Sequence, residues 1–141
     1  METVANLSLF RVTARPGSGL ELDLASRRVL YTIPTGYGGP TQLRGSNVQN
    51  LLTFAQTVQG QSQIMVLDAD TGVVRQVTNV APGGWGVRWP SFSPDDQCVA
   101  FNAINVPGMK DGIYSINLDG SGLRFITGGS GSVVGRPMWK R

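Results

Sequence analysis

Apolar and polar residues alternate along much of the chain, as in strands with one buried and one exposed face. In the segment IYSINL, residues 113–118, the odd-numbered side chains would lie on one face of a strand and the even-numbered ones on the other. The turn residues Asp119, Gly120 and Gly122 follow directly, and residues of these types favour a tight hairpin. The pattern predicts short strands joined by turns, and helix is not expected.

Hairpins of this kind recur three times along the chain. They are LELDLASRRVLYT at 20–32, IMVLDADTGVVRQVT at 64–78 and IYSINLDGSGLRFIT at 113–127. Each closes on a threonine, and a glycine-rich loop then leads to a proline, at Pro40, Pro90 and Pro137. The intervals between these prolines, 50 and 47 residues, are too long for ankyrin or leucine-rich repeats and fit a four-stranded β-propeller blade.

The strand count predicts an all-β fold with three four-stranded propeller blades in the chain. Four strands are expected in the second segment, near 41–44, 50–56, 63–67 and 73–78, and four in the third, near 88–92, 98–102, 113–118 and 123–127. The first segment offers only three, near 7–13, 20–24 and 28–33, and its missing strand is expected in RPMWK, residues 136–140. We therefore expect a single domain over 1–141, with blade 1 at 1–39 plus 136–141 from a partner chain, blade 2 at 40–88 and blade 3 at 89–135.

Three blades cannot surround an axis, because a closed propeller needs at least four. We expect two copies to join head to tail as a homodimer with a six-bladed ring. In that ring Pro137, Met138 and Trp139 of each chain complete the first blade of the other, which removes the free sheet edges. Two alternatives stay open: a trimer with nine blades, and a longer propeller of which this chain is a part.

One segment has a more specific pattern. WPSFSPDDQCVAFNAIN at 89–105, followed by DGIYSINLDGSGLRFIT at 111–127, resembles the WD40-like (PD40) repeat of TolB-type six-bladed β-propellers. In the turn SPDD, Pro94 fixes one backbone angle, and Ser93 and Asp95 can accept backbone N–H bonds. Asp96 stands where the family prefers glycine, and the second segment lacks Ser-Pro-Asp. The resemblance implies a propeller that binds protein partners, although related six-bladed propellers include lactonases.

The charges do not suggest a nucleic-acid partner, and a membrane partner is not expected because no stretch approaches the length of a membrane span. The chain has 12 basic and 9 acidic residues, a net charge of +3, and no run of like charge except the locally basic RPMWKR at 136–141. The N-terminal METVANLSLFRVTA has neither the basic start nor the apolar run of a signal peptide. A cytoplasmic location is expected, or a periplasmic one if Met1 is not the natural start.

Catalytic chemistry is not expected either. The chain has no histidine, which removes the commonest general base and zinc ligand, and Cys98 is its single cysteine. Asp68 to Gly72, DADTG, opens like a calcium loop, but no glutamate follows Glu21 to complete one. We therefore predict no catalytic, cofactor-binding or metal-binding residues.

Partner recognition is expected on the loops that join one blade to the next. These stretches contain Tyr37, Trp85, Arg88 and Arg136 amid glycines. Aromatic and arginine side chains on flexible surface loops commonly anchor binding partners. The leading hypothesis is a non-catalytic scaffold that binds a protein or peptide at this loop face. The alternative is a small-molecule or carbohydrate site, including a lactonase-like hydrolase, at the central channel.

The three tryptophans are expected to differ in exposure. Trp85 lies in a glycine-rich connection and should be exposed. Trp89 and Trp139 lie in expected inner strands and should pack between blades.

Overall fold

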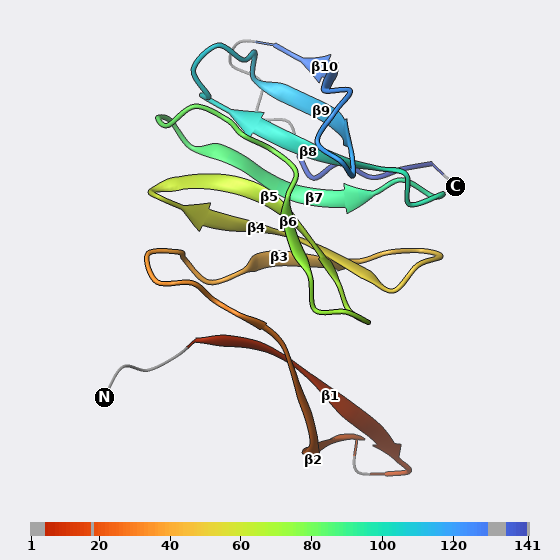
Figure 1. Cartoon of the computed structure of the whole chain (residues 1–141). Helices are drawn as coiled ribbons and strands as arrows, with labels where there is room; N and C mark the ends of the chain where they lie inside the picture. Colours follow the sequence, from red (N-terminus) through yellow and green to blue (C-terminus); the bar gives the residue numbers. More distant parts are fainter. Residues whose placement is uncertain (1–4, 18, 130–134, 141) are drawn as a thin grey trace.

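The computed structural model describes residues 5–17, 19–129 and 135–140. Within them the chain is all-β and forms three sheets. The strands are β1 (Asn6–Arg15), β2 (Gly19–Thr32), β3 (Thr41–Gly45), β4 (Leu51–Val58), β5 (Gln61–Asp68), β6 (Val74–Gln76), β7 (Gly86–Phe92), β8 (Cys98–Ile104), β9 (Gly112–Asn117) and β10 (Arg124–Gly128). Figure 1 shows the sheets stacked, with the β1–β2 hairpin at one end and β10 at the other.

The second and third sheets are four-stranded, as predicted. Their strand orders are β3-β4-β5-β6 and β7-β8-β9-β10, with antiparallel neighbours throughout. The expected division between residues 88 and 89 falls inside β7, which already begins at Gly86. The third sheet therefore starts earlier than the alternation alone indicated.

In both sheets the first strand pairs with the second in the same register, and corresponding residues of the two sheets are 47 positions apart in sequence. Thr41 pairs with Ala55 as Arg88 pairs with Asn102, and in both sheets an irregularity follows within three residues. On this register the counterpart of Pro90 is Leu43, so the alignment of Pro40 with Pro90 expected from the sequence is wrong. The spacing shows that a proline is not required at this position.

The turn between these strands is also repeated, although the sequence concealed it. Ser93 N donates to Cys98 O at 2.8 Å, and the Ser93 hydroxyl accepts from Cys98 N at 3.1 Å. Ser46 makes the same two bonds with Leu51, at 2.9 and 3.0 Å. The second segment has thus lost Pro-Asp but kept the serine that closes the turn.

The first segment differs from its prediction. It forms a two-stranded sheet, because β2 continues from Gly19 to Thr32 instead of dividing into two strands. The reason lies at Asp23, whose side chain accepts from Ala25 N at 3.1 Å and whose carbonyl accepts from the Ser26 hydroxyl at 2.6 Å. This local turn lets the strand bulge and resume pairing with β1 beyond it.

The C-terminal segment 135–140 forms no strand in the single chain. It lies on its own third sheet, where Trp139 Nε1 donates to Ser91 O at 3.1 Å. The first sheet of the same chain lies at the opposite end of the stack (Figure 1), so this segment has no strand of that sheet within reach. The expected strand at 136–140 is therefore not present within one chain.

Two apolar clusters hold the sheets together. The larger lies between the second and third sheets and includes Ile64, Val66, Val87 and Phe101. The smaller lies between the first and second sheets, where Leu30 and neighbouring side chains pack on the second sheet. The hydrophobic effect therefore stabilises the stack as a series of sheet-on-sheet contacts.

Candidate binding site on the inner strands

The first strands of the second and third sheets carry matching backbone irregularities. Gln42 has φ of 58° and Trp89 has φ of 54°, and the two residues occupy counterpart positions. Left-handed backbone is uncommon outside glycine, and bulges of this kind redirect a side chain. Trp89 N donates to Gln42 Oε1 at 2.7 Å, which ties the two strands together.

Residues spaced 47 apart in sequence, from β3, β7 and the C-terminal segment, surround one hollow of about 180 Å³. The spacing of 47 residues relates positions 42, 89 and 136, and also positions 43, 90 and 137. We call this surface the inner wall. Its residues are Gln42, Leu43, Arg44, Trp89, Pro90, Arg136 and Pro137.

An aromatic and cationic group lies beside the inner wall. The Arg88 guanidinium lies 5.6 Å from the ring centre of Trp85 and 5.9 Å from that of Trp89. It also donates to Trp85 O at 3.1 Å. Arg88 is thus held by two cation–π contacts and a hydrogen bond, which fix the direction of its charge.

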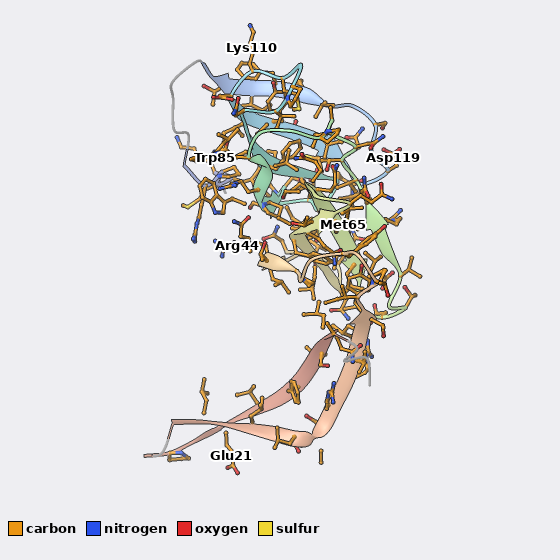
Figure 2. All side chains as sticks on the ribbon, turned by 90° about the vertical axis from the view of Figure 1, so that its left-hand side faces the viewer. Glu21, Arg44, Met65, Trp85, Lys110 and Asp119 are labelled. Atoms are coloured by element: carbon orange, nitrogen blue, oxygen red, sulfur yellow. The ribbon has the colours of Figure 1, made fainter. Side chains whose placement is uncertain are left out.

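The prediction that Trp85 is exposed is confirmed, because 64% of its surface is accessible. Trp89 is half-buried, and Trp139 is 36% exposed and hydrogen-bonded to the third sheet. Figure 2 shows Trp85 and Arg44 on the same side of the stack, away from Asp119.

A second hollow, of about 350 Å³, adjoins Trp85 and Arg88. Most of the residues that line it are polar, and Gln42 lines both this hollow and the inner wall. The two hollows therefore meet at Gln42, with Arg88 and Trp89 beside it.

The loop that carries Trp85 is anchored, unlike the flexible loop expected from its glycines. The buried side chain of Gln61 accepts from Gly83 N at 2.8 Å, and Trp85 N donates to Ile104 O at 3.3 Å. Gly84 lies so close to Asn105 that an added Cβ would be 1.5 Å from its carbonyl oxygen. Trp85 is thus presented on a fixed support.

Of the four predicted partner-binding residues, the structure brings Trp85 and Arg88 into direct contact and connects Arg136 to them only through Trp89. Trp85 and Arg88 share one hollow, and Arg136 belongs to the inner wall that Trp89 connects to them. Tyr37 lines neither hollow. Its backbone pairs with Val58 at the end of β4, and its side chain is half-buried.

The site is cationic in the described part of the chain. Arginines line both hollows and no carboxylate does. Asp95 and Asp119 lie in turns, where hydrogen bonds lower the pKa of each carboxyl, chiefly those from the hydroxyls of Ser93 and Ser121 respectively. Among the described residues no group of three histidine, cysteine or acidic side chains is placed to hold a metal ion.

Asp96 is a structural residue that the sequence analysis did not identify. Its side chain is buried, and its carboxylate accepts from the backbone N–H groups of Asn47, Val48 and Gln49 at 2.7–2.8 Å. Burial disfavours the charged form, but these hydrogen bonds outweigh it and hold the pKa below the ordinary 3.8. The available signal was that Asp96 stands where the resembled family prefers glycine. Its φ of 54° explains that preference.

Comparison with known proteins supports the fold. No family model matches the chain. No curated protein matches it either. Among solved structures, the crystal structure of TolB from Acinetobacter baumannii is similar, with a TM-score of 0.57, 18% identity, and coverage of 85% of this chain and 29% of that one. The chain therefore spans less than a third of the length of that TolB.

The described part of the chain contains no helix with the length and apolar character needed to cross a bilayer. Together with the structural match, the three sheets show an all-β fold similar to TolB, a β-propeller protein.

Proposed function

We propose that this chain is a non-catalytic recognition scaffold that binds a protein or peptide segment through Trp85, Arg88 and the inner wall. The observation that carries the proposal is the anchored pair of Trp85 and Arg88, with an exposed indole beside a guanidinium held by two rings. Tryptophan and arginine are the residue types most often found at binding hot spots. Because the loop is already fixed, little conformational entropy would be lost on binding.

The charge of the surface supports one class of ligand segment. Arg44, Arg88 and Arg136 lie along it without a lining carboxylate. A peptide that carries carboxylates and an apolar side chain would satisfy both the arginines and the tryptophan rings.

The experiment is selection of peptides from a displayed random library on the immobilised 141-residue protein. Selected peptides should bind the wild-type protein, and Trp85→Ala and Arg88→Ala should each weaken binding about tenfold or more. Arg75→Ala, a matched change on β6 and outside both hollows, should leave binding unchanged. Equal effects of Arg88→Ala and Arg75→Ala would contradict the proposal.

The polar hollow beside Trp85 favours carbohydrate as a second candidate ligand. Half of the residues that line it carry hydroxyl or amide side chains, and they lie next to an exposed indole. A panel of sugars should be measured by thermal shift alongside the peptides. A sugar that stabilises the wild-type protein but not Trp85→Ala, with no peptide selected, would favour this alternative.

A further inference from the structure

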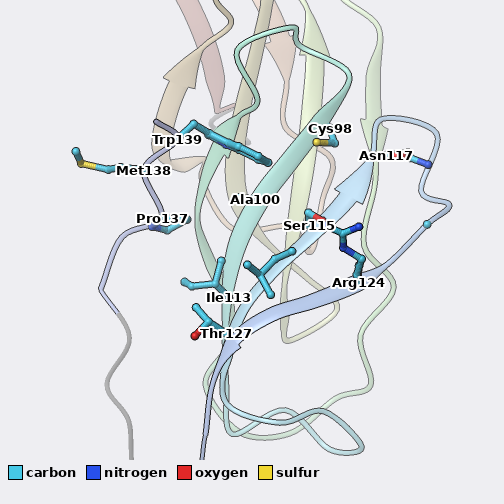
Figure 3. Close-up of a pocket in the computed structure, with 12 residues that line it drawn as sticks. Cys98, Ala100, Ile113, Ser115, Asn117, Arg124, Thr127, Pro137, Met138 and Trp139 are labelled. Atoms are coloured by element: carbon cyan, nitrogen blue, oxygen red, sulfur yellow. The ribbon is translucent and has the colours of Figure 1, made fainter. Parts of the chain in front are cut away.

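The outward face of the third sheet is hollowed and has no sheet against it in the described chain. The hollow measures about 660 Å³. We call this surface the open face. Its residues on the sheet include Cys98, Ala100, Ile113, Ser115, Arg124 and Ile126. Figure 3 shows Pro137, Met138 and Trp139 along one side of the hollow, with Ser115 and Arg124 on the other.

The corresponding face of the second sheet is covered. By the shared register, Cys98, Ala100, Ile113 and Ser115 of the open face correspond in the second sheet to Leu51, Thr53, Ile64 and Val66. All four residues of the second sheet are buried, and the third sheet packs over them. The open face thus continues an interface already formed once in this molecule, and the next sheet of the series would cover it.

The C-terminal segment already occupies the place where such a sheet would begin. Arg136 and Pro137 line the same hollow as Trp89 and Pro90, which stand 47 residues earlier in the sequence. The next residues run along the open face as far as Trp139. The C-terminal segment therefore lies where the first strand of a covering sheet would be, but the described chain supplies no further strands beside it.

The other end of the stack offers such strands. The β1–β2 hairpin is a two-stranded sheet, which is marginally stable in water by itself. It exposes large apolar side chains, and those of Val12, Leu20 and Leu22 lie on one face, because Val12 pairs with Leu22 and alternate residues of a strand share a face. These bulky side chains complement the small ones, such as Ala100 and Ser115, that leave the open face hollow.

We propose that a second copy of this chain covers the open face. The β1–β2 hairpin of the second copy lies against β8, β9 and β10 of the first. The segment 136–140 of the first copy pairs with β1 of that hairpin. The second copy's open face receives the hairpin of the first, so the contact closes after two chains. The proposal is independent of the ligand proposed above and extends beyond it.

The first experiment measures the mass of the full chain by size-exclusion chromatography with light scattering across a range of concentrations. The expected mass is twice the 15.1 kDa of one chain. A single-chain mass at every concentration would overturn the proposal and leave the open face to a different partner. A three-chain mass or open polymers would overturn closure by two copies.

Charged variants test which surfaces meet. Leu22→Asp on the hairpin and Ile126→Asp on the open face should each raise the dimer dissociation constant more than about tenfold, because an unpaired carboxylate would be buried among apolar groups. Val73→Asp, at an exposed apolar position in the β5–β6 turn, is the matched control and should leave the dimer intact. Cooperative thermal unfolding of each variant shows that it is folded.

Mixing the two variants tests the head-to-tail arrangement. The Leu22→Asp chain keeps its open face and the Ile126→Asp chain keeps its hairpin, so the mixture can form one intact contact. Partial recovery of the dimer is expected in the mixture. Absence of recovery, with both variants folded, would overturn the head-to-tail contact.

Cys98 gives a readout in the unmodified protein. It is the single cysteine, is half-buried and lines the open face. Its labelling by a maleimide should slow several-fold as the protein concentration rises into the dimer range. A labelling rate that does not change with concentration while the mass doubles would place the contact elsewhere and overturn the proposal.

Discussion

The second and third sheets share a backbone register but differ in what covers them. The second has apolar neighbours on both faces, whereas the third has a sheet on one face and a hollow on the other. Their facing residues differ accordingly, since Leu51 and Val66 correspond to Cys98 and Ser115. One repeat can thus keep its hydrogen-bond pattern while its surface is adapted to a different neighbour.

Truncating a side chain should cost much more stability on the covered face of the third sheet than on its open face. Phe101 is fully buried against the second sheet, so Phe101→Ala should lower the free energy of unfolding by about 4 kcal/mol. Ile126 lies on the open face and is 46% exposed, so Ile126→Ala should cost less than about 1 kcal/mol in the monomer. Urea unfolding at low protein concentration measures both. Equal costs would show that the two faces are equally covered.

Asp96 joins the turn between β7 and β8 to the loop between β3 and β4. Asp96→Asn should lower the free energy of unfolding by about 3 kcal/mol, because an amide cannot accept all the N–H groups that meet the carboxylate. Asp95→Asn, in the same turn but exposed, should cost far less. Denaturant unfolding of the two variants provides the test. A larger loss for Asp95→Asn would contradict the role given to Asp96.

The same carboxylate predicts how stability depends on pH. The folded-state pKa of Asp96 lies below the ordinary 3.8, so its contribution is present above that value and is lost as the pH falls through the folded pKa. The free energy of unfolding should therefore fall below pH 3.8. The fall should be shallower in Asp96→Asn. Parallel pH profiles for the wild type and the variant would contradict this.

Two glycine-containing loops should differ in whether they tolerate a side chain. Gly84→Ala should displace the Trp85 loop, since its Cβ would overlap the Asn105 carbonyl, and should cost about 1–2 kcal/mol while weakening any ligand of Trp85. Gly39→Ala in the preceding connection meets no atom and should change neither quantity. Thermal unfolding and tryptophan fluorescence measure the difference. An unchanged Trp85 signal in Gly84→Ala would mean that the loop is not held as described.

The sequence allowed the two four-stranded sheets to be predicted, because alternation and turn residues are local signals. Strands such as β8 and β9 were expected within a residue or two of their ends. The first segment was predicted less well, since the Asp23 turn looks like a hairpin in sequence but acts as a bulge.

The candidate site was only partly predictable, for a physical reason. Trp85 and Arg88 could be identified by residue type, but the contact that fixes their loop comes from Gln61, more than twenty residues earlier. The hydrogen bonds that Asp96 accepts likewise come from residues of the neighbouring sheet. Contacts between elements distant in sequence leave no local pattern, so glutamine and aspartate in these roles look like ordinary surface residues.

The most direct test is hydrogen exchange at the backbone amides of Met138, Trp139 and Lys140, measured by NMR at low and high protein concentration. If the C-terminal segment begins the sheet that a second copy extends, at least one of these amides becomes protected as the concentration rises. Rapid exchange of all three at every concentration would contradict that account.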